Sequence, residues 1–200
     1  MNTIITEKTE DGHELSYDIF SKLIHSRILF LHDFITDEIA TDIVATLLYL
    51  DHENDQDKIS IYLNSGGGDI ESVFMIYDMM KMIKSPIETL CTGAALGESA
   101  LILAAGTKGM RYATKSALIC LNQLNYSYSK HSDMINAEIT LQQAKKQNKK
   151  FLTALHDCIG KTVKELSYDT ERDLYLTPTA AKKYGIIDSI IGDKDAKVRK

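Results

Sequence analysis

The stretch Leu90–Gly106, LCTGAALGESALILAAG, has the form that presents a reactive side chain. It begins as a short apolar run, breaks at Gly93 and ends in a compact helix closed by Ala-Ala-Gly. A strand that turns sharply into the N-terminus of a helix mounts a nucleophile beside free backbone N–H groups. At the tip of this turn stands Gly97, which has no side chain. The stretch therefore predicts the frame of a nucleophilic site without its nucleophile.

Ser99 is the alternative nucleophile in this stretch. On a helix, two residues correspond to about 200° of rotation, so Ser99 points away from the direction of position 97. The segment GESAL is also an incomplete G-x-S-x-G elbow, because Leu101 replaces the last glycine. An active serine endopeptidase that uses Ser99 or another non-standard site remains the alternative to a chain without catalysis.

The histidines of the chain are scattered, and no two of them have the spacing of metal ligands. Surface or capping roles suit them better than a role as catalytic base, and we predict neither a metal site nor a cofactor. The six histidines are His13, His25, His32, His52, His131 and His156.

The composition is that of a globular protein with one domain. The chain has 200 residues, is 44% hydrophobic and 26% charged, and carries a formal net charge of −5. This charge argues against nucleic-acid or membrane partners bound through electrostatics. An apolar run of the roughly 20 residues needed to span a bilayer is absent, and the polar N-terminus resembles no targeting peptide. Three cysteines in apolar contexts indicate a reduced compartment, either the cytoplasm or an organelle stroma or matrix: Cys91, Cys120 and Cys158.

Strands alternate with helices along most of the chain, which predicts an α/β fold with a parallel sheet. Residues 1–16 lack periodicity and predict a mobile arm. Thr36 caps a helix with an acidic first turn, whose apolar face is Ile39, Ile43, Leu47 and Leu50. Further helices are predicted over 69–84, between the turn at Gly93 and Ala105, and over 178–184, where Thr177 caps the helix and Gly185 ends it. Strands are predicted over 27–31, 59–63, 87–91, 117–121 and 186–191.

One long helix over Ser132–Cys158 departs from this alternation. Its apolar positions keep helical spacing, but Gln142–Lys150, QQAKKQNKK, is polar all round. A helix with a polar middle projects from a globular body or bridges to another subunit, although a simply solvated amphipathic helix has a similar pattern.

Five blocks of the sequence closely resemble the proteolytic subunit of the Clp protease, the ClpP family, which has a crotonase-like fold. The blocks are DIFSKLIHSRILFL, ISIYLNSGGG, IYDMMKMIK, ILAAGTKGMRYA and YDTERDLYLTPTAAKKYGIIDSI. They occur in the family order and spacing. The resemblance implies a parallel-sheet head with a projecting handle helix at about 123–160. It divides the chain into an axial-loop arm (1–16), a ClpP-like domain (17–192) and a polar tail (193–200).

The family mechanism is a Ser/His/Asp triad in which histidine takes the proton of the attacking serine. The resemblance places the serine at Gly97, the histidine at Asn122 and the aspartate at Asp169. An amide does not titrate and cannot act as the base. One triad residue of three is therefore retained.

The resemblance also implies an oxyanion hole formed by the backbone N–H groups of Gly68 and Glu98. A carboxylate at position 98 repels a developing negative charge, unless it points to solvent. In NYSYSKHSD, Tyr126 and Tyr128 replace light residues of the strand that pairs with substrate. These tyrosines either alter the substrate groove or simply pack.

Partners are also implied by the resemblance. Seven subunits form a ring, and two rings stack into a tetradecamer through their handle helices. Glu171 and Arg172 match the ring-contact pair. Grooves on the outer ring face receive loops of an AAA+ unfoldase. Tyr62, Met82, Leu90 and Tyr112 match groove positions, while Ser60 and Thr114 replace larger apolar residues there.

These observations predict a ClpR-type subunit that has kept the ring architecture and lost catalysis. Such a chain mixes with an active ClpP paralogue, or with copies of itself, in a complex that degrades polypeptides. A crotonase-fold protein acting on an acyl thioester is a third hypothesis, which the handle helix and the YDTERD block disfavour.

Overall fold

The computed structural model describes residues 4–8, 11, 14–124 and 133–192. Tyr126, Tyr128, His13, His131 and the tail 193–200 lie outside the described residues, so the predictions made for them stay predictions.

A seven-stranded, mostly parallel sheet forms the centre of the described structure, which confirms the predicted α/β class. Five strands follow one another as neighbours: β3 (Ile28–His32), β4 (Ile59–Ser65), β5 (Ile87–Leu96), β6 (Arg111–Thr114) and β9 (Ser189–Ile191). β7 (Leu118–Leu121) pairs in parallel with the far end of β5, and β8 (Leu174–Leu176) pairs antiparallel with β7.

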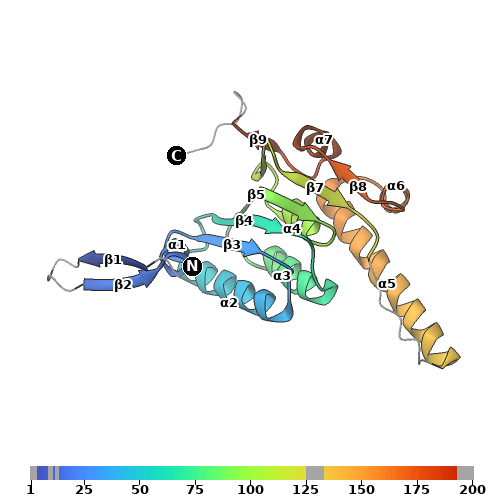
Figure 1. The fold of residues 1–200 in the computed structure, drawn as a ribbon, viewed down its shortest axis with the longest axis horizontal. Coiled ribbons are helices and arrows are strands. Elements are labelled where there is room, and N and C mark those ends of the chain that lie inside the picture. The colour runs from blue at the N-terminus through green and yellow to red at the C-terminus, as the bar shows by residue number, and fades with distance from the viewer. Residues whose placement is uncertain (1–3, 9–10, 12–13, 125–132, 193–200) are drawn as a thin grey trace.

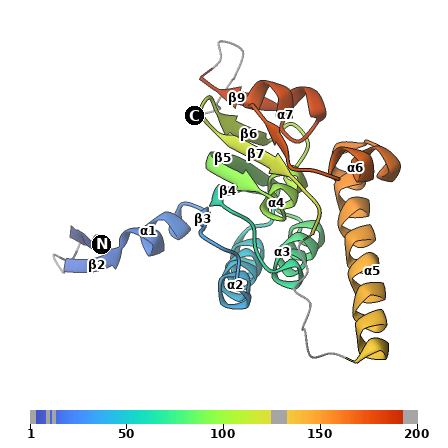
Figure 2. The same cartoon turned by 45° about the vertical axis from the view of Figure 1, so that its right-hand side comes forward.

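Helices α2 (Asp37–Glu53), α3 (Ile70–Met82) and α4 (Ser99–Ala105) pack beside this sheet (Figures 1 and 2). The Thr36 hydroxyl accepts a hydrogen bond from the Ile39 N–H, so the predicted cap of α2 is confirmed. α2 buries Ala40, Ile43, Leu47 and Leu50, which includes three residues of the predicted apolar face. Asp69 caps α3 in the same way, through the Ser72 N–H.

The long helix α5 (Met134–Ile159) extends from the head, as the sequence predicts (Figures 1 and 2). Its C-terminal part buries Phe151, Leu152 and Leu155 against the head, whereas Met134 and Ile135 at its start are exposed. The remaining helices are α1 (Ile19–His25), α6 (Val163–Asp169) and α7 (Pro178–Tyr184), and the predicted Thr177 cap and Gly185 end of α7 are confirmed.

The N-terminal segment differs from the prediction. β1 (Ile4–Lys8) and β2 (Glu14–Asp18) form a two-stranded antiparallel sheet, with Ile4 opposite Asp18 and Lys8 opposite Glu14. This hairpin extends away from the head in Figure 1. Cross-strand backbone hydrogen bonds order residues whose sequence has no apolar alternation, and this is why the pattern gave no sign of a strand.

β5 also differs from its predicted length, because it continues through Gly93 to Leu96. Its first half pairs with β4 and β6, and its last residues pair with β7. A side chain at Gly93 would clash with Asn64, because an added Cβ would lie 2.3 Å from Asn64 Oδ1. That oxygen accepts the Ala94 N–H at 3.0 Å. The Asn64 side chain thus provides a hydrogen bond at the place where the β4–β5 register shifts, between Leu63 and Ser65. The short strands β6 and β8 are absent from the sequence-based prediction.

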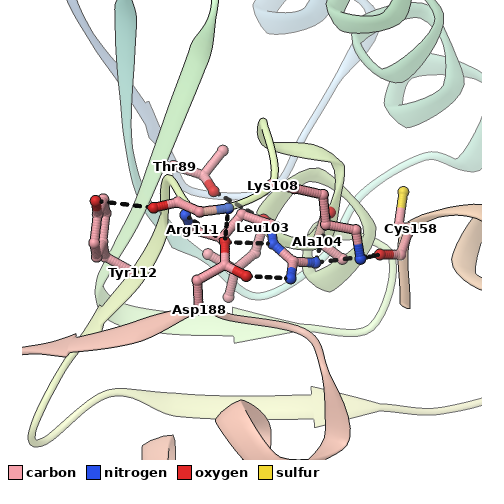
Figure 3. A network of polar contacts seen from close by, with 9 residues as sticks. Thr89, Leu103, Ala104, Lys108, Arg111, Tyr112, Cys158 and Asp188 are labelled. Atoms are coloured by element: carbon pink, nitrogen blue, oxygen red, sulfur yellow. Dashed lines mark hydrogen bonds and ion pairs between the residues drawn. The ribbon is translucent and has the colours of Figure 1, made fainter. Parts of the chain in front are cut away.

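A buried arginine holds several of these elements together (Figure 3). The Arg111 side chain is 3% exposed and binds the Asp188 carboxylate through Nε at 2.9 Å and Nη2 at 2.6 Å. Its Nη1 donates to the carbonyls of Ala104 (3.4 Å) and Cys158 (3.2 Å). Arg111 thereby joins β6, the segment before β9, the end of α4 and the end of α5.

The seven residues of α4 are all buried, so the carbonyls at its C-terminal end need partners from the protein. The Thr89 hydroxyl donates to Leu103 O at 2.8 Å, and Lys81 Nζ donates to Ala105 O at 2.8 Å. Together with Arg111 on Ala104, these groups satisfy three successive carbonyls. The helix that follows the Gly97 turn is therefore fixed at its far end.

Replacing Arg111 with alanine leaves Asp188 and the Ala104 carbonyl without their partner. We expect Arg111→Ala to lower the free energy of unfolding by about 3–5 kcal/mol, measured by chemical denaturation. As a control, Lys84→Ala removes the exposed Lys84–Asp55 ion pair and costs less than about 1 kcal/mol. Equal effects of the two variants would contradict this interpretation.

The pKa of Asp188 predicts a pH dependence. Burial raises this pKa, but the hydrogen bonds and charge of Arg111 outweigh burial and lower it below 3.8. Stability contributed by the ionised carboxylate is present above the unfolded value and lost as pH falls through the lower folded value. The difference in unfolding free energy between the native chain and Asp188→Asn should be constant from about pH 5 upward and shrink in more acidic solution. A difference that persists unchanged at low pH would contradict this.

Candidate functional site

A cavity of about 800 Å³ lies beside the Gly97 turn. Its lining comes from the glycine loop between β4 and α3, the Gly97 turn, the ends of β7 and β8, and one face of α5. The acidic residues in its lining are Asp69, Glu71, Glu98 and Asp173. Among the described residues, neither a histidine, a lysine nor an arginine lines it.

Gly97 and Asn122 lie side by side in the lining of this cavity. Gly97 is buried, has a φ of +56°, and donates its N–H to Cys120 O at 3.0 Å. A Cβ added at position 97 would lie 3.1 Å from Asn122 Oδ1. The left-handed backbone suits glycine, and any other residue there is strained. The structure thus brings together the two positions that the resemblance assigns to the nucleophile and the base.

Asp169 is not brought to this pair, which corrects the expectation for it. Its carboxylate accepts the Tyr184 hydroxyl at 2.6 Å and lies 3.5 Å from Lys161 Nζ, and it does not line the cavity. Burial and the hydrogen bond to Asp169 raise the pKa of Tyr184. Asp169 therefore holds the end of α6 against α7.

Asp173 occupies the place expected for Asp169. β7 and β8 pair antiparallel with Leu121 opposite Leu174 and Cys120 opposite Tyr175. Extending this register by one residue places Asn122 beside Asp173. Because side chains alternate along strands, Cys120, Asn122, Asp173 and Tyr175 share one face, and all four line the cavity. The motif YDTERD contains two aspartates, and this cross-strand register was the signal that distinguishes them.

Ser99 does not reach the cavity. It is fully buried, and its Oγ donates to Ser65 O at 3.0 Å and to Leu96 O at 2.8 Å. A nucleophilic serine needs a base within hydrogen-bonding reach of its hydroxyl and space for a carbonyl carbon. The Ser99 hydroxyl instead has two backbone carbonyls as acceptors. This geometry fits a structural role at the start of α4.

Glu98 turns its carboxylate toward the glycine loop and not toward solvent. Its Oε2 accepts the Gly68 N–H at 3.4 Å. The same oxygen would lie 2.7 Å from a Cβ added at Gly67, whose φ is +117°. Gly68 itself packs against Ile35, where an added Cβ would lie 2.4 Å from the Ile35 Cβ. The predicted oxyanion-hole amide of Gly68 therefore has a carboxylate beside it.

All three cysteines are buried and free, which agrees with the apolar sequence around each of them. Cys120 lines the cavity, and burial together with the negative charge of Asp173 raises the pKa of its thiol. Burial raises the pKa of Cys91 to about 11 and also raises that of Cys158. A raised pKa favours the protonated thiol, which is a poorer nucleophile than the thiolate.

The expected docking residues separate into two groups. Tyr62, Leu90 and Tyr112 are direct neighbours across β4, β5 and β6, and Phe30 of β3 continues the row. Phe30 and Tyr62 stack with ring centroids 5.2 Å apart. Met82 is the last residue of α3 and is 66% exposed, so it belongs to a helix and not to this row of strand residues.

The two replaced groove residues lie near the same row. Ser60 is buried with its hydroxyl donating to Glu88, and Thr114 ends β6. The expected ring-contact residues Glu171 and Arg172 are both exposed, just after α6. Their exposure leaves them accessible to a neighbouring subunit.

The part of the chain that the structure describes contains neither a candidate metal cluster nor a candidate membrane span. No three histidine, cysteine or acidic side chains gather there in a way that would hold a metal ion. None of the described helices combines the length and apolar character needed to cross a membrane.

A family model described as Clp protease matches residues 11–194.

The position of Asp173 can be tested through Cys120. Because the Asp173 charge raises the pKa of the Cys120 thiol, Asp173→Asn should lower this pKa and increase the thiolate fraction. We expect faster alkylation of Cys120 by iodoacetamide near pH 8.5, followed by peptide mass mapping. Asp169→Asn is the matched control and should leave the rate unchanged. Acceleration by the Asp169 variant alone would contradict the geometry described above.

Proposed function

The chain belongs to the Clp protease family, and on that premise we propose that it is a ClpR-type, non-catalytic subunit of a Clp protease complex. Members of this family form rings and pair with AAA+ unfoldases. In the proposed role, the chain contributes ring and chamber structure and unfoldase docking to a complex whose active serines belong to another subunit.

The observation that carries this proposal is Gly97. The strand, the turn and the helix that present a nucleophile are all in place, and the turn ends in a residue with no side chain. Attack on a peptide carbonyl needs a nucleophile and a base that takes its proton. Beside Gly97 the cavity offers the amide of Asn122 at the position of the base. Of the other groups in its lining, Cys120 has a thiol whose pKa is raised, and the Thr140 hydroxyl donates to Asn136 O.

The position of the triad aspartate also supports a non-catalytic role. In a Ser/His/Asp triad the carboxylate orients an imidazole, and here Asp173 lies beside an asparagine. Asp173 therefore retains the position of the triad aspartate without a histidine to orient. The alternative of an active peptidase using Ser99 is disfavoured by the burial and the hydrogen bonds of that hydroxyl.

The features proposed for assembly are independent of catalysis. A closed ring needs subunits with matching interfaces, but not every subunit needs a nucleophile. The projecting α5, the exposed Glu171 and Arg172, and the row of Tyr62, Leu90 and Tyr112 support ring formation and docking of an unfoldase loop. An active ClpP-type paralogue is the partner that we propose for mixed rings.

Mixing the purified chain with an active ClpP-type subunit tests this proposal. We expect native mass spectra to contain particles with both chains. Hydrolysis of a fluorogenic peptide should follow the number of active subunits alone, and particles made only of this chain should give none. Hydrolysis by such particles that Ser99→Ala abolishes would contradict the proposal, as would a complete failure of the two chains to mix.

A further inference from the structure

The Glu98 side chain makes an unusual contact for its place in the fold. Glu98 holds the N-cap position of α4, yet it makes no capping hydrogen bond to that helix. Its carboxylate crosses instead to the loop before α3, where Oε2 accepts the Gly68 N–H at 3.4 Å. The Glu98 carboxylate is thus the hydrogen-bond acceptor for the backbone N–H of Gly68, a residue that lines the cavity.

Two features of the loop make this place suitable for an anion. Gly68 directly precedes Asp69, the N-cap of the 13-residue helix α3, so the carboxylate lies near the positive end of that helix dipole. Gly67 has no side chain, and an added Cβ there would approach Glu98 Oε2 to 2.7 Å. The contact therefore depends on glycine at position 67.

We propose that the Glu98 carboxylate occupies the place where the oxyanion would form. It blocks catalysis at this site independently of the other two features, the absence of a serine at position 97 and of a histidine at position 122. This inference rests on the proposed function, because it concerns the same site. In acyl transfer the carbonyl oxygen becomes negatively charged and needs backbone N–H donors. The Glu98 carboxylate takes the Gly68 donor and repels the charge that would form there.

A consequence is that restoring the nucleophile and the base is not sufficient for catalysis. Gly97→Ser/Asn122→His restores both groups but leaves Glu98 on the Gly68 amide. Adding Glu98→Ala frees that amide. A fluorophosphonate probe reports the difference, because the serine Oγ forms a bond to phosphorus, fluoride leaves, the histidine takes the serine proton, and a phosphoryl oxygen needs the oxyanion donor.

The rate of probe labelling is compared between the double variant and the triple variant. Removal of one oxyanion donor typically costs about 10²–10³ in rate, so we expect the triple variant to react at least about tenfold faster. Glu53→Ala in the double background is the matched control, because Glu53 is an acidic residue on α2 bonded to Tyr49, outside the cavity. This control should not change the rate.

A triple variant that reacts less than about tenfold faster than the double variant overturns the inference. Labelling of the unmodified chain would overturn the proposed function instead, so the two failures are distinguishable.

A second measurement keeps Gly97 and Asn122 unchanged and does not depend on catalysis. In a ¹⁵N-glycine-labelled chain, Glu98→Ala should move the Gly68 amide proton upfield, because a hydrogen bond to a carboxylate deshields it. The Gly109 amide, which donates to Asp188 at 2.7 Å, provides an internal reference that should not move. An unchanged Gly68 resonance overturns the inference.

Discussion

The buried Arg111 guanidinium is the constraint on which the arrangement of the head depends. It satisfies the Ala104 carbonyl at the end of α4, binds Asp188 before β9, and holds the Cys158 carbonyl at the end of α5. A fully buried helix requires such partners, because unpaired carbonyls in the interior cost several times a normal hydrogen bond. These contacts fix the C-terminal end of α4, the helix that begins after the Gly97 turn (Figure 3).

In this arrangement, the backbone that shapes the site is held by interactions that do not involve reactive side chains. The backbone of the turn, the face shared by Asn122 and Asp173, and the Gly68 amide are held by β-sheet pairing and by buried hydrogen bonds. None of these interactions requires a serine at position 97 or a histidine at position 122. Glycine at position 97 also relieves the strain of a left-handed backbone, which a catalytic side chain would have to bear. Under the proposed function, the frame is kept without the reactive groups because the fold does not depend on them.

Sequence reasoning succeeded where the determining signals are local. The Thr36 and Thr177 caps, the apolar face of α2 and the long helix α5 follow from residue types at helical spacing. The short strands β6 and β8 and the N-terminal hairpin could not be predicted, because their pairing joins segments with little periodicity of their own. The choice between Asp169 and Asp173 depends on the register between β7 and β8. The direction of the Glu98 carboxylate is set by a contact with a loop thirty residues earlier.

The proposed non-catalytic role is tested most directly in mixed particles that contain this chain and an active ClpP-type subunit. After exposure to a fluorophosphonate, the two chains are separated and their intact masses measured, so that the active subunit is the positive control within the same particle. The account predicts a single adduct on the active subunit and none on this chain. An adduct on this chain, in any fraction comparable to that on its partner, would contradict it.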